Sequence, residues 1–352
     1  MDTSSKKRTN AARMGLRATM ADIAELAGVT KMTVSRVLRH PEQVRPETRG
    51  RIQRVIDELG YVPNRAAGSL TAGRSGLVAA IVPTLRHSLF ADTIEGMSDV
   101  LAAAGFDLIL ANSRYRTDVE ESQIRALLER RPDAIVLTGL THTREARQLL
   151  RNAGVPVVET WESTHEPIDA AVGFSNRDAA HAMTLALVEL GYRRIVFVNG
   201  PIETNERARH RAEGYLAAVK ESGVALLPIE VVRDVGAIRT ETGARVLRKI
   251  MRSRPDVDAV FYTSDVFAVG AILEARALGF NVPERLGVAG FHDLEIGRLV
   301  SPTLTTVHLP ALEIGRCAGE LILNRLAGRS ASRAGRELPF SIVLRESTRP
   351  AP

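Results

Sequence analysis

The segment ERARHRAEGY contains the densest group of side chains that could bind a charged ligand. Arg207, Arg209 and Arg211 alternate where a loop enters a helix that we expect over residues 205–222. Guanidinium groups near a helix N-terminus favour an anion, because backbone N–H groups and the helix dipole add to their positive charge. Alternatively, these arginines are solvated or form internal ion pairs. The segment therefore indicates either an anion site or an ordinary charged helix.

A second group of polar side chains lies in VTKMTVSRVLRH, which we expect to form a helix that Pro41 ends. Val34, Val37 and Leu38 would form its apolar face. Four side chains share the opposite face: Lys31, Met32, Ser35 and Arg36. A helix-turn-helix places such a face in the major groove of DNA. The alternative is a surface helical hairpin with solvated charges.

Two further short helices complete a three-helix unit around this segment. One covers MADIAELAG, with Thr19 as a candidate N-cap and Gly28 as its stop; the other begins at Pro46 and stops at Gly60. Residues 1–75 carry 14 Lys and Arg against 7 Asp and Glu, whereas the rest of the chain carries 33 against 34. A basic unit on a neutral body is typical of a protein that binds a polyanion.

From about Gly76 the pattern changes to apolar strands that alternate with helices. Eight strands are expected, with the sequences LVAAIV, FDLILAN, AIVLT, VPVVE, IVFVN, IEVV, AVFYT and LGVAGF, and PFSIVLRE offers a final one. Helices are expected near residues 90–104, 118–130, 176–190, 205–222, 238–253 and 265–278. This alternation predicts a parallel, doubly wound α/β architecture. About ten strands exceed one compact sheet, so we expect two lobes whose strands point their carboxyl ends at a cleft.

Several classes of protein are disfavoured by what the sequence lacks. It has no Gly-x-Ser-x-Gly elbow, no phosphate loop, no Gly-x-Gly-x-x-Gly after a strand and no His-Glu-x-x-His pair. Its single cysteine, Cys317, excludes an intramolecular disulfide and is expected to be a small buried residue. It has neither a membrane span nor an apolar signal segment. We therefore expect a cytoplasmic protein without enzyme activity, cofactor or metal.

The run MADIAELAGVTKMTVSRVLRHPEQV, the downstream ELGYVPNR and the segment SDVFAVGAILEARALGFNVPERLGVAGFHD together resemble the LacI family of bacterial repressors, over practically the whole chain. The resemblance implies an all-α helix-turn-helix headpiece and a two-lobed, periplasmic-binding-protein-like α/β core with two doubly wound parallel sheets. It also implies a homodimer that binds palindromic operator DNA. An effector bound between the lobes would reorient them and thereby change operator affinity. The sequence offers no leucine heptads that would join two dimers.

The resemblance also divides the chain into segments. They are a basic flexible tail at 1–17, the headpiece at 18–62, a hinge helix with its linker at 63–75, and the core at 76–352. One lobe of the core would comprise about 76–174 and 305–330, and the other about 175–304 and 331–350. In the hinge, Leu70 would wedge into the DNA minor groove and bend the duplex. Gly68 weakens this short helix by about 1 kcal/mol relative to alanine.

For DNA, Lys31 and Met32 match the positions that choose bases in the family. Lysine can donate to guanine, and methionine can contact a thymine methyl group. The TVSR element supplies three further contacts, from Thr33, Ser35 and Arg36. Three more residues are expected to contact the DNA backbone: Thr19, Thr30 and Asn64. Helix capping is the alternative role of these last residues.

For the effector, Arg211 matches a familiar binding residue of the family, and His292 stands where many sugar-binding relatives carry an aspartate. Replacing that carboxylate removes repulsion toward an acidic ligand. With TKMTVSR, LTGLTHT, AVGFSN and GFHD, these residues resemble the gluconate and ketogluconate repressors and imply a sugar acid; a neutral sugar or nucleobase is the alternative. Further residues are expected at the cleft: Phe90, Glu159, Trp161, Phe174, Arg207, Arg209, Ser264 and Asp265. Asp265 could instead cap a helix, and Trp161 could pack between the lobes.

Overall fold

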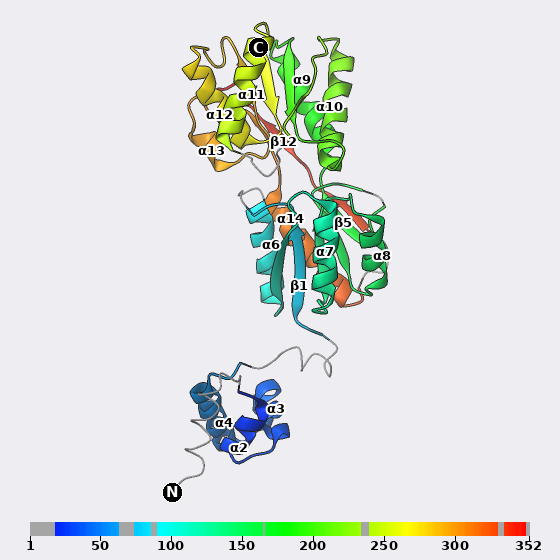
Figure 1. Cartoon of the computed structure of the whole chain (residues 1–352), viewed down its shortest axis with the longest axis vertical. Helices are drawn as coiled ribbons and strands as arrows, with labels where there is room; N and C mark the ends of the chain where they lie inside the picture. The colour runs from blue at the N-terminus through cyan, green and yellow to red at the C-terminus, as the bar shows by residue number, and fades with distance from the viewer. Residues whose placement is uncertain are drawn as a thin grey trace. The chain divides into compact units, whose positions relative to one another are not determined.

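A computed structural model of the chain describes residues 18–62, 74–85, 90–164, 166–233, 239–329 and 334–349. Contacts divide the chain into two compact units, Met1–Ser75 and Gly76–Pro352 (Figure 1). The tail at 1–17, Asn64, Leu70 and most of the expected hinge lie outside the described residues. No helix within the described ranges is long and apolar enough to cross a membrane.

The first unit is a bundle of short helices whose ends are set by local capping. It contains α2 (Met20–Leu26), α3 (Lys31–Arg39), the 3-10 turn η1 (Pro41–Gln43) and α4 (Pro46–Leu59). Thr19 and Asp22 form a capping box at α2, Thr30 caps α3, and Gly60 ends α4 in a left-handed conformation. All three α-helices contribute to a small core that includes Ile23, Val34, Val37, Ile52 and Ile56. The predicted helical headpiece is confirmed.

The first lobe of the second unit is built on a six-stranded sheet in the order β11-β5-β4-β3-β1-β2, all parallel. The strands are β1 (Leu77–Val82), β2 (Asp107–Asn112), β3 (Ala134–Thr138), β4 (Val157–Thr160), β5 (Ala170–Gly173) and β11 (Ala334–Glu337). Its helices are α6 (Ala91–Ala103), α7 (Thr117–Leu128), α8 (Arg144–Asn152) and α14 (Ala311–Leu326).

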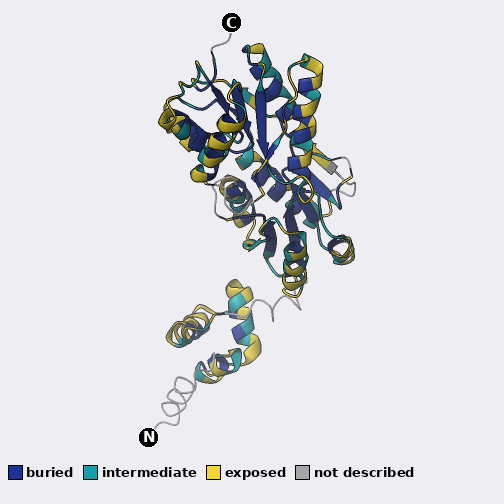
Figure 2. Cartoon of the chain, turned by 45° about the horizontal axis from the view of Figure 1, so that its top comes forward, coloured by how far each residue is buried: buried dark blue, intermediate teal, exposed yellow. Residues whose placement is uncertain are grey.

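Alternation along β1 supplies the two faces of this sheet. Val78 and Ala80 pack with residues of α6 and α14, whereas Ala79 and Ile81 pack with residues of α7 and α8. Figure 2 shows the strands buried between helices whose outer faces are exposed. Both faces are covered, as a parallel sheet requires.

The second lobe has a four-stranded parallel sheet in the order β7-β6-β8-β9. The strands are β6 (Ile195–Asn199), β7 (Glu230–Val231), β8 (Ala259–Tyr262) and β9 (Gly287–Ala289). Its helices are α9 (Asn176–Glu189), α10 (Glu206–Ser222), α11 (Thr240–Ser253), α12 (Asp265–Ala277) and α13 (Glu295–Leu299). Residues of α9 and α10 pack on one face of β6, and residues of α11 and α12 pack on the other. The prediction of two doubly wound parallel sheets is confirmed.

The chain passes between the lobes after β5, before α14 and after β11. Two of these passages pair as antiparallel strands, β10 (Thr306–His308) and β12 (Ser341–Val343). The expected assignment of residues 331–350 to the second lobe is wrong for β11, which pairs with β5 in the first lobe. The sequence AGRE carries no apolar alternation, because this edge strand is held by backbone hydrogen bonds and its residues at 335–337 are exposed.

Candidate functional site

Helix α3 presents a row of solvent-facing side chains on the first unit. Lys31, Met32 and Arg36 are exposed, while Val34 and Val37 are buried against the other helices. Met32 is 71% exposed. Neither Lys31 nor Arg36 forms a salt bridge with another described residue. The face is thus available to a polyanion.

The threonines expected near DNA have capping roles in the structure. Thr19 Oγ1 donates to Asp22 Oδ2 at 2.7 Å, and Thr30 Oγ1 accepts from the backbone N–H of Thr33 at 3.2 Å. The hydroxyl of Thr33 lies 2.9 Å from that of Thr30. These bonds hold the first turns of α2 and α3 in place. The DNA contacts assigned to these residues stay a prediction.

A cavity in the second unit lies where strands of both sheets end. Tyr115 follows β2, Trp161 follows β4, Ser264 follows β8 and His292 follows β9. This is the position at which parallel sheets bind ligands. Six residues expected at the cleft line this cavity: Phe90, Trp161, Arg207, Arg211, Ser264 and His292. The start of α10 supplies the two arginines.

Arg211 is partly buried and held by neutral partners. Its Nε donates to Asn176 Oδ1 at 2.8 Å, and its guanidinium lies 4.7 Å from the centre of the Phe291 ring. Burial, with a contribution from the nearby charge of Arg207, lowers the pKa of Arg211 to about 10. Arg211 therefore remains a cation at neutral pH without a paired carboxylate.

Arg207 is also nearly buried, with 6% of its surface exposed. Its nearest carboxylate oxygen is Glu206 Oε1, 4.0 Å from Nε, and its Nη1 has no hydrogen-bond partner among the described residues. Two cations thus share a cavity wall in which, among the described residues, no aspartate or glutamate takes part. In a region of low dielectric constant this arrangement favours an anion.

His292 is neutral in this cavity. Burial, together with the charges of Arg211 and Arg207, lowers its pKa well below the ordinary value. Its backbone N–H donates to Val307 O at 2.9 Å and its φ is +113°, so the loop holds the backbone of this residue in an uncommon conformation. His292 therefore adds a hydrogen-bonding group to the wall without adding charge.

Three buried polar atoms of the wall have no partner among the described residues: Trp161 Nε1, Arg207 Nη1 and His292 Nδ1. An unsatisfied buried polar group costs about 1–3 kcal/mol. A ligand that reached all three would recover part of this cost. Trp161 itself is held by edge contacts with Phe90 and His292, whose ring centres lie 5.1 and 6.2 Å away. The wall thus combines aromatic surface with unpaired polar groups.

Two residues expected at the cleft face elsewhere. On α10, residues 207 and 211 are four apart and share a face, but Arg209 lies on the opposite side and approaches Glu213 Oε1 at 3.9 Å in solvent. The expectation that Arg209 lies at the cleft is wrong, because residues two apart in a helix do not share a face. Phe174 is fully buried behind Trp161, at a ring-centre distance of 6.2 Å, and does not line the cavity.

Glu159 also lies away from the cavity, inside the first lobe. Its Oε1 is 3.2 Å from His142 Nε2 and its Oε2 accepts from the Ile168 N–H at 2.6 Å. His142 Nδ1 lies 2.5 Å from Glu120 Oε1. Burial opposes the charged imidazole, but hydrogen bonds to the two carboxylates raise the pKa of His142 to about 9. The prediction that Glu159 lies at the cleft is wrong, because this residue belongs to an internal ion cluster with His142 and Glu120.

Asp265 neither lines the cavity nor caps α12 through its side chain. The N-cap position belongs to Ser264. Asp265 Oδ1 accepts from Thr306 Oγ1 and its Oδ2 accepts from the Leu294 N–H, both at 2.6 Å. Burial raises the pKa of Asp265 to about 6. Both expected roles are wrong, because Asp265 instead fastens the loop that carries His292.

The cavity wall also contains residues that sequence reasoning missed. They include Tyr115, Asn199, Asn205, Thr263 and Phe267. Asn205 Oδ1 accepts from the backbone N–H groups of Arg207 and Ala208, so it caps α10 and sets the direction of the arginines. An asparagine just before a helical run is a recognisable cap signal. Tyr115 carried no such signal.

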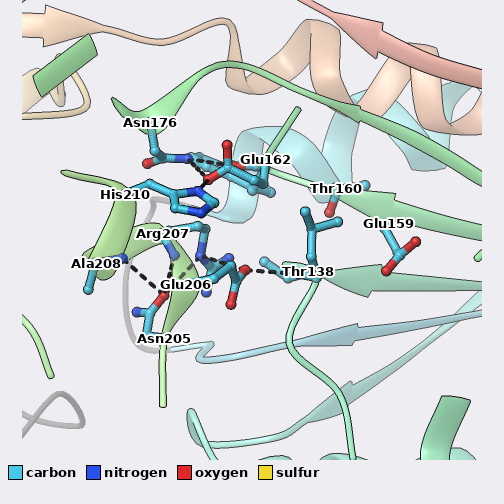
Figure 3. Close-up of polar contacts among 12 residues, drawn as sticks. Thr138, Glu159, Thr160, Glu162, Asn176, Asn205, Glu206, Arg207, Ala208 and His210 are labelled. Carbon is cyan, nitrogen blue, oxygen red and sulfur yellow. Dashed lines mark hydrogen bonds and ion pairs between the residues drawn. The ribbon is translucent and has the colours of Figure 1, made fainter. Parts of the chain in front are cut away.

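Side chains from α10 join the lobes beside the cavity (Figure 3). Glu206 Oε1 accepts from the Leu140 N–H of the first lobe at 2.9 Å, and His210 Nδ1 lies 2.9 Å from Glu162 Oε2. The hydrogen bond to Glu162 raises the pKa of His210. The cavity between the lobes measures about 60 Å³. This is below the roughly 300 Å³ of common ligand pockets, so a ligand requires the lobes or side chains to separate.

Comparisons with known proteins match both units. A family model described as bacterial regulatory proteins, lacI family, matches residues 19–64, and one described as a periplasmic binding protein-like domain matches residues 184–348. The HTH-type transcriptional regulators GntR and IdnR of Escherichia coli (strain K12) are each 36% identical to this chain, over 93% of it and 97% of each relative. The crystal structure of a LacI family transcriptional regulator from Silicibacter pomeroyi is 35% identical, with a TM-score of 0.87 over 94% of this chain and 99% of that one.

The similarity to these regulators covers nearly their whole length. It therefore includes both the headpiece and the two-lobed core. The chain therefore belongs to the LacI family of bacterial regulatory proteins and is a DNA-binding transcriptional regulator, not an enzyme.

Proposed function

We propose that this regulator is a repressor whose affinity for a palindromic operator is controlled by a sugar acid bound between the lobes. The observation that carries the proposal is the charge of the cavity wall. Arg207 and Arg211 line it, His292 is neutral, and no carboxylate among the described residues lines it. A ligand carboxylate would pair with the arginines, and ligand hydroxyls would reach Trp161 Nε1 and His292 Nδ1.

Gluconate and 2-ketogluconate are the sugar acids that we propose first. The resemblance of TKMTVSR, LTGLTHT, AVGFSN and GFHD to the gluconate and ketogluconate repressors supports this choice. The hydrophobic faces of Phe90 and Trp161 are suited to the C–H surfaces of a carbohydrate chain. A neutral sugar or a nucleobase would leave the two arginines without a counter-charge, which is a costly arrangement in a closed cavity.

On DNA, we propose that a homodimer places one α3 helix in each half-site. Lys31, Met32, Thr33, Ser35 and Arg36 would face the major groove, and the exposure of Lys31, Met32 and Arg36 supports this assignment. Thr19, Thr30 and Asn64 would contact the DNA backbone, and Leu70 would enter the minor groove. Effector binding would separate the lobes and change operator affinity by about 1–3 kcal/mol.

A thermal-shift comparison of gluconate and 2-ketogluconate with glucose, a neutral counterpart, tests the proposal. A ligand at 100 times its dissociation constant adds roughly 2.7 kcal/mol to the free energy of unfolding. We expect a shift with an acid and none with glucose. A shift with neutral sugars or nucleosides alone would overturn the sugar-acid assignment, while operator binding in the same preparation would report separately on the headpiece.

A further inference from the structure

We propose that Asn176 is a positioning residue that orients Arg211 and ties it to the first lobe. This inference rests on the proposed effector site. Asn176 is the first residue of α9 in the second lobe, and its side chain is fully buried. Sequence reasoning assigned it no role. The argument depends on both ends of its amide group.

The two ends of the Asn176 amide bind residues of different lobes, and Figure 3 shows the end that faces Glu162. Its Oδ1 accepts from Arg211 Nε at 2.8 Å. Its Nδ2 donates to Trp161 O at 2.9 Å and to Glu162 Oε2 at 3.1 Å. Trp161 and Glu162 follow β4 of the first lobe, whereas Arg211 belongs to α10 of the second. One side chain therefore connects two residues of the cavity wall, Arg211 and Trp161, across the lobes.

The chemistry of the partners fixes the direction of this amide. The carbonyl oxygen faces a cationic guanidinium, and the amino group faces a carboxylate and a carbonyl oxygen. A flipped amide would place its donor against Arg211 and its acceptor against Glu162, with unfavourable contacts at both ends. An aspartate at position 176 has acceptors only, so it could keep the bond to Arg211 but would repel Glu162. Asparagine is thus matched to its surroundings by polarity as well as by size.

Glu162 of the first lobe contacts both Asn176 and His210 of the second lobe. Its side chain is 3% exposed, and its Oε2 lies near both Asn176 Nδ2 and His210 Nδ1. Gly173 of β5 packs against the backbone of Glu162, where a Cβ atom would lie 2.4 Å from the Glu162 nitrogen. The backbone of Glu162 is therefore held in place, and burial and its contacts with Asn176 and His210 restrain the carboxylate. A shift of Arg211 toward a ligand would act through Asn176 on a fixed anchor in the first lobe.

The main test exchanges donor and acceptor across the lobes. In Asn176→Asp the bond to Glu162 is replaced by repulsion, and we expect gluconate affinity, measured by calorimetry, to fall at least ten-fold. In the double variant Asn176→Asp with Glu162→Gln, the glutamine amide can donate to Asp at 176, whereas Trp161 O still faces an acceptor. We therefore expect affinity at least three-fold above that of the single variant. Failure of this reciprocal rescue would overturn the inference.

Charge alone requires a separate control, since the double variant also restores the net charge. Glu213 is an exposed residue of α10 outside this network. Asn176→Asp with Glu213→Gln restores the net charge without restoring the hydrogen bond, so its affinity should stay low. Equal recovery in the two double variants would contradict a positioning role. Asn281→Asp, at an exposed site, controls for the same chemical change elsewhere.

Hydrogen exchange measured without ligand tests the role of Asn176 independently of the proposed effector. The Leu140 N–H donates to Glu206 across the lobes, so its hydrogen exchange reports their separation. We expect faster exchange of this amide in Asn176→Asp and slower exchange in the double variant with Glu162→Gln than in the single variant. If the parent protein binds no sugar acid, the proposed function fails, and this exchange pattern alone decides the role of Asn176.

Asn176→Ala provides a second variant that should fold. Ser175 caps α9, with its Oγ accepting from the Asp178 N–H at 3.1 Å, so alanine at 176 leaves the cap intact. It removes both ends of the connection, and we expect faster Leu140 exchange together with weaker gluconate binding. Unchanged exchange and affinity in a folded Asn176→Ala protein would overturn the inference.

Discussion

Helices α3 and α10 both carry basic side chains in a short segment, but the structure places them in opposite environments. On α3, Lys31 and Arg36 project into solvent. On α10, Arg207 is buried and Arg211 is partly buried at the edge of a cavity, where asparagines and an aromatic ring hold them. Exposed cations attract a polyanion through many weak, salt-dependent contacts, whereas enclosed cations select a small anion that fits their geometry. The same residue types thus suit different ligands because burial changes their electrostatics.

The largest expected effect is that of Arg211→Ala. Removing one partner of a buried charge pair typically costs about 2–5 kcal/mol, so the variant should lose the thermal shift with gluconate. Operator binding, measured by fluorescence anisotropy without effector, should persist because α3 belongs to a separate unit. An unaltered shift would show that the cavity arginine is not needed for the ligand.

Arg36→Ala should have the opposite pattern. Loss of a specific contact from a recognition helix typically costs about 1–3 kcal/mol and relaxes sequence specificity. We expect operator affinity to fall about ten-fold or more while the gluconate shift is kept. Arg36→Lys separates the charge of this residue from its bidentate geometry. Loss of both DNA binding and the ligand shift would indicate misfolding and undermine the comparison between the two helices.

His142 offers a buried cation that, unlike Arg207, has two carboxylate partners. Its folded pKa of about 9 exceeds the ordinary value of 6.5, so its stabilising contribution is complete below pH 6.5 and is lost as pH rises through about 9. Relative to His142→Gln, the free energy of unfolding should fall by roughly 1 kcal/mol per pH unit across that interval. Urea denaturation at several pH values measures it, and a difference that does not vary with pH would contradict the assigned charge.

Arg209→Ala should have the smallest effect. Its side chain is exposed and its contact with Glu213 is a surface ion pair at 3.9 Å. Such a substitution normally changes stability by less than about 0.5 kcal/mol, and gluconate binding should equal that of the parent protein. It is therefore the matched control for Arg211→Ala on the same helix. A loss of ligand response here would show that the cavity does not define the site.

Most of the fold could be predicted from local patterns. Apolar runs in the sequence predicted eight strands: β1, β2, β3, β4, β6, β7, β8 and β9. Capping residues such as Thr19 and Thr30 predicted where the headpiece helices begin. Elements that lack a local signal were missed. Strand β5 is short, with the small side chains AAVG, and β11 is an exposed edge strand; both depend on pairing with segments distant in the sequence.

The candidate site could be predicted in part, because strand ends and helix starts limit which residues can face a cleft. Trp161 and Arg207 were found in this way, and the family resemblance added Arg211 and His292. Glu159 shows the limit of the method, since a carboxylate at a strand end can equally turn inward to an internal histidine. Asn176 shows the reverse limit, because its role depends on partners contributed by another helix and by the other lobe.

The sequence by itself determined the helix-turn-helix, the alternation of strands with helices and the two-lobed parallel architecture, because caps and apolar periodicity act over a few residues. Only the tertiary structure decided which charges are buried and what they meet. It turned Arg209 into solvent, paired Glu159 with His142, used Asp265 to fasten a loop and left His292 neutral between cations. The physical reason is that burial and charge depend on neighbours from distant segments, and these are fixed only when the two sheets fold and face each other.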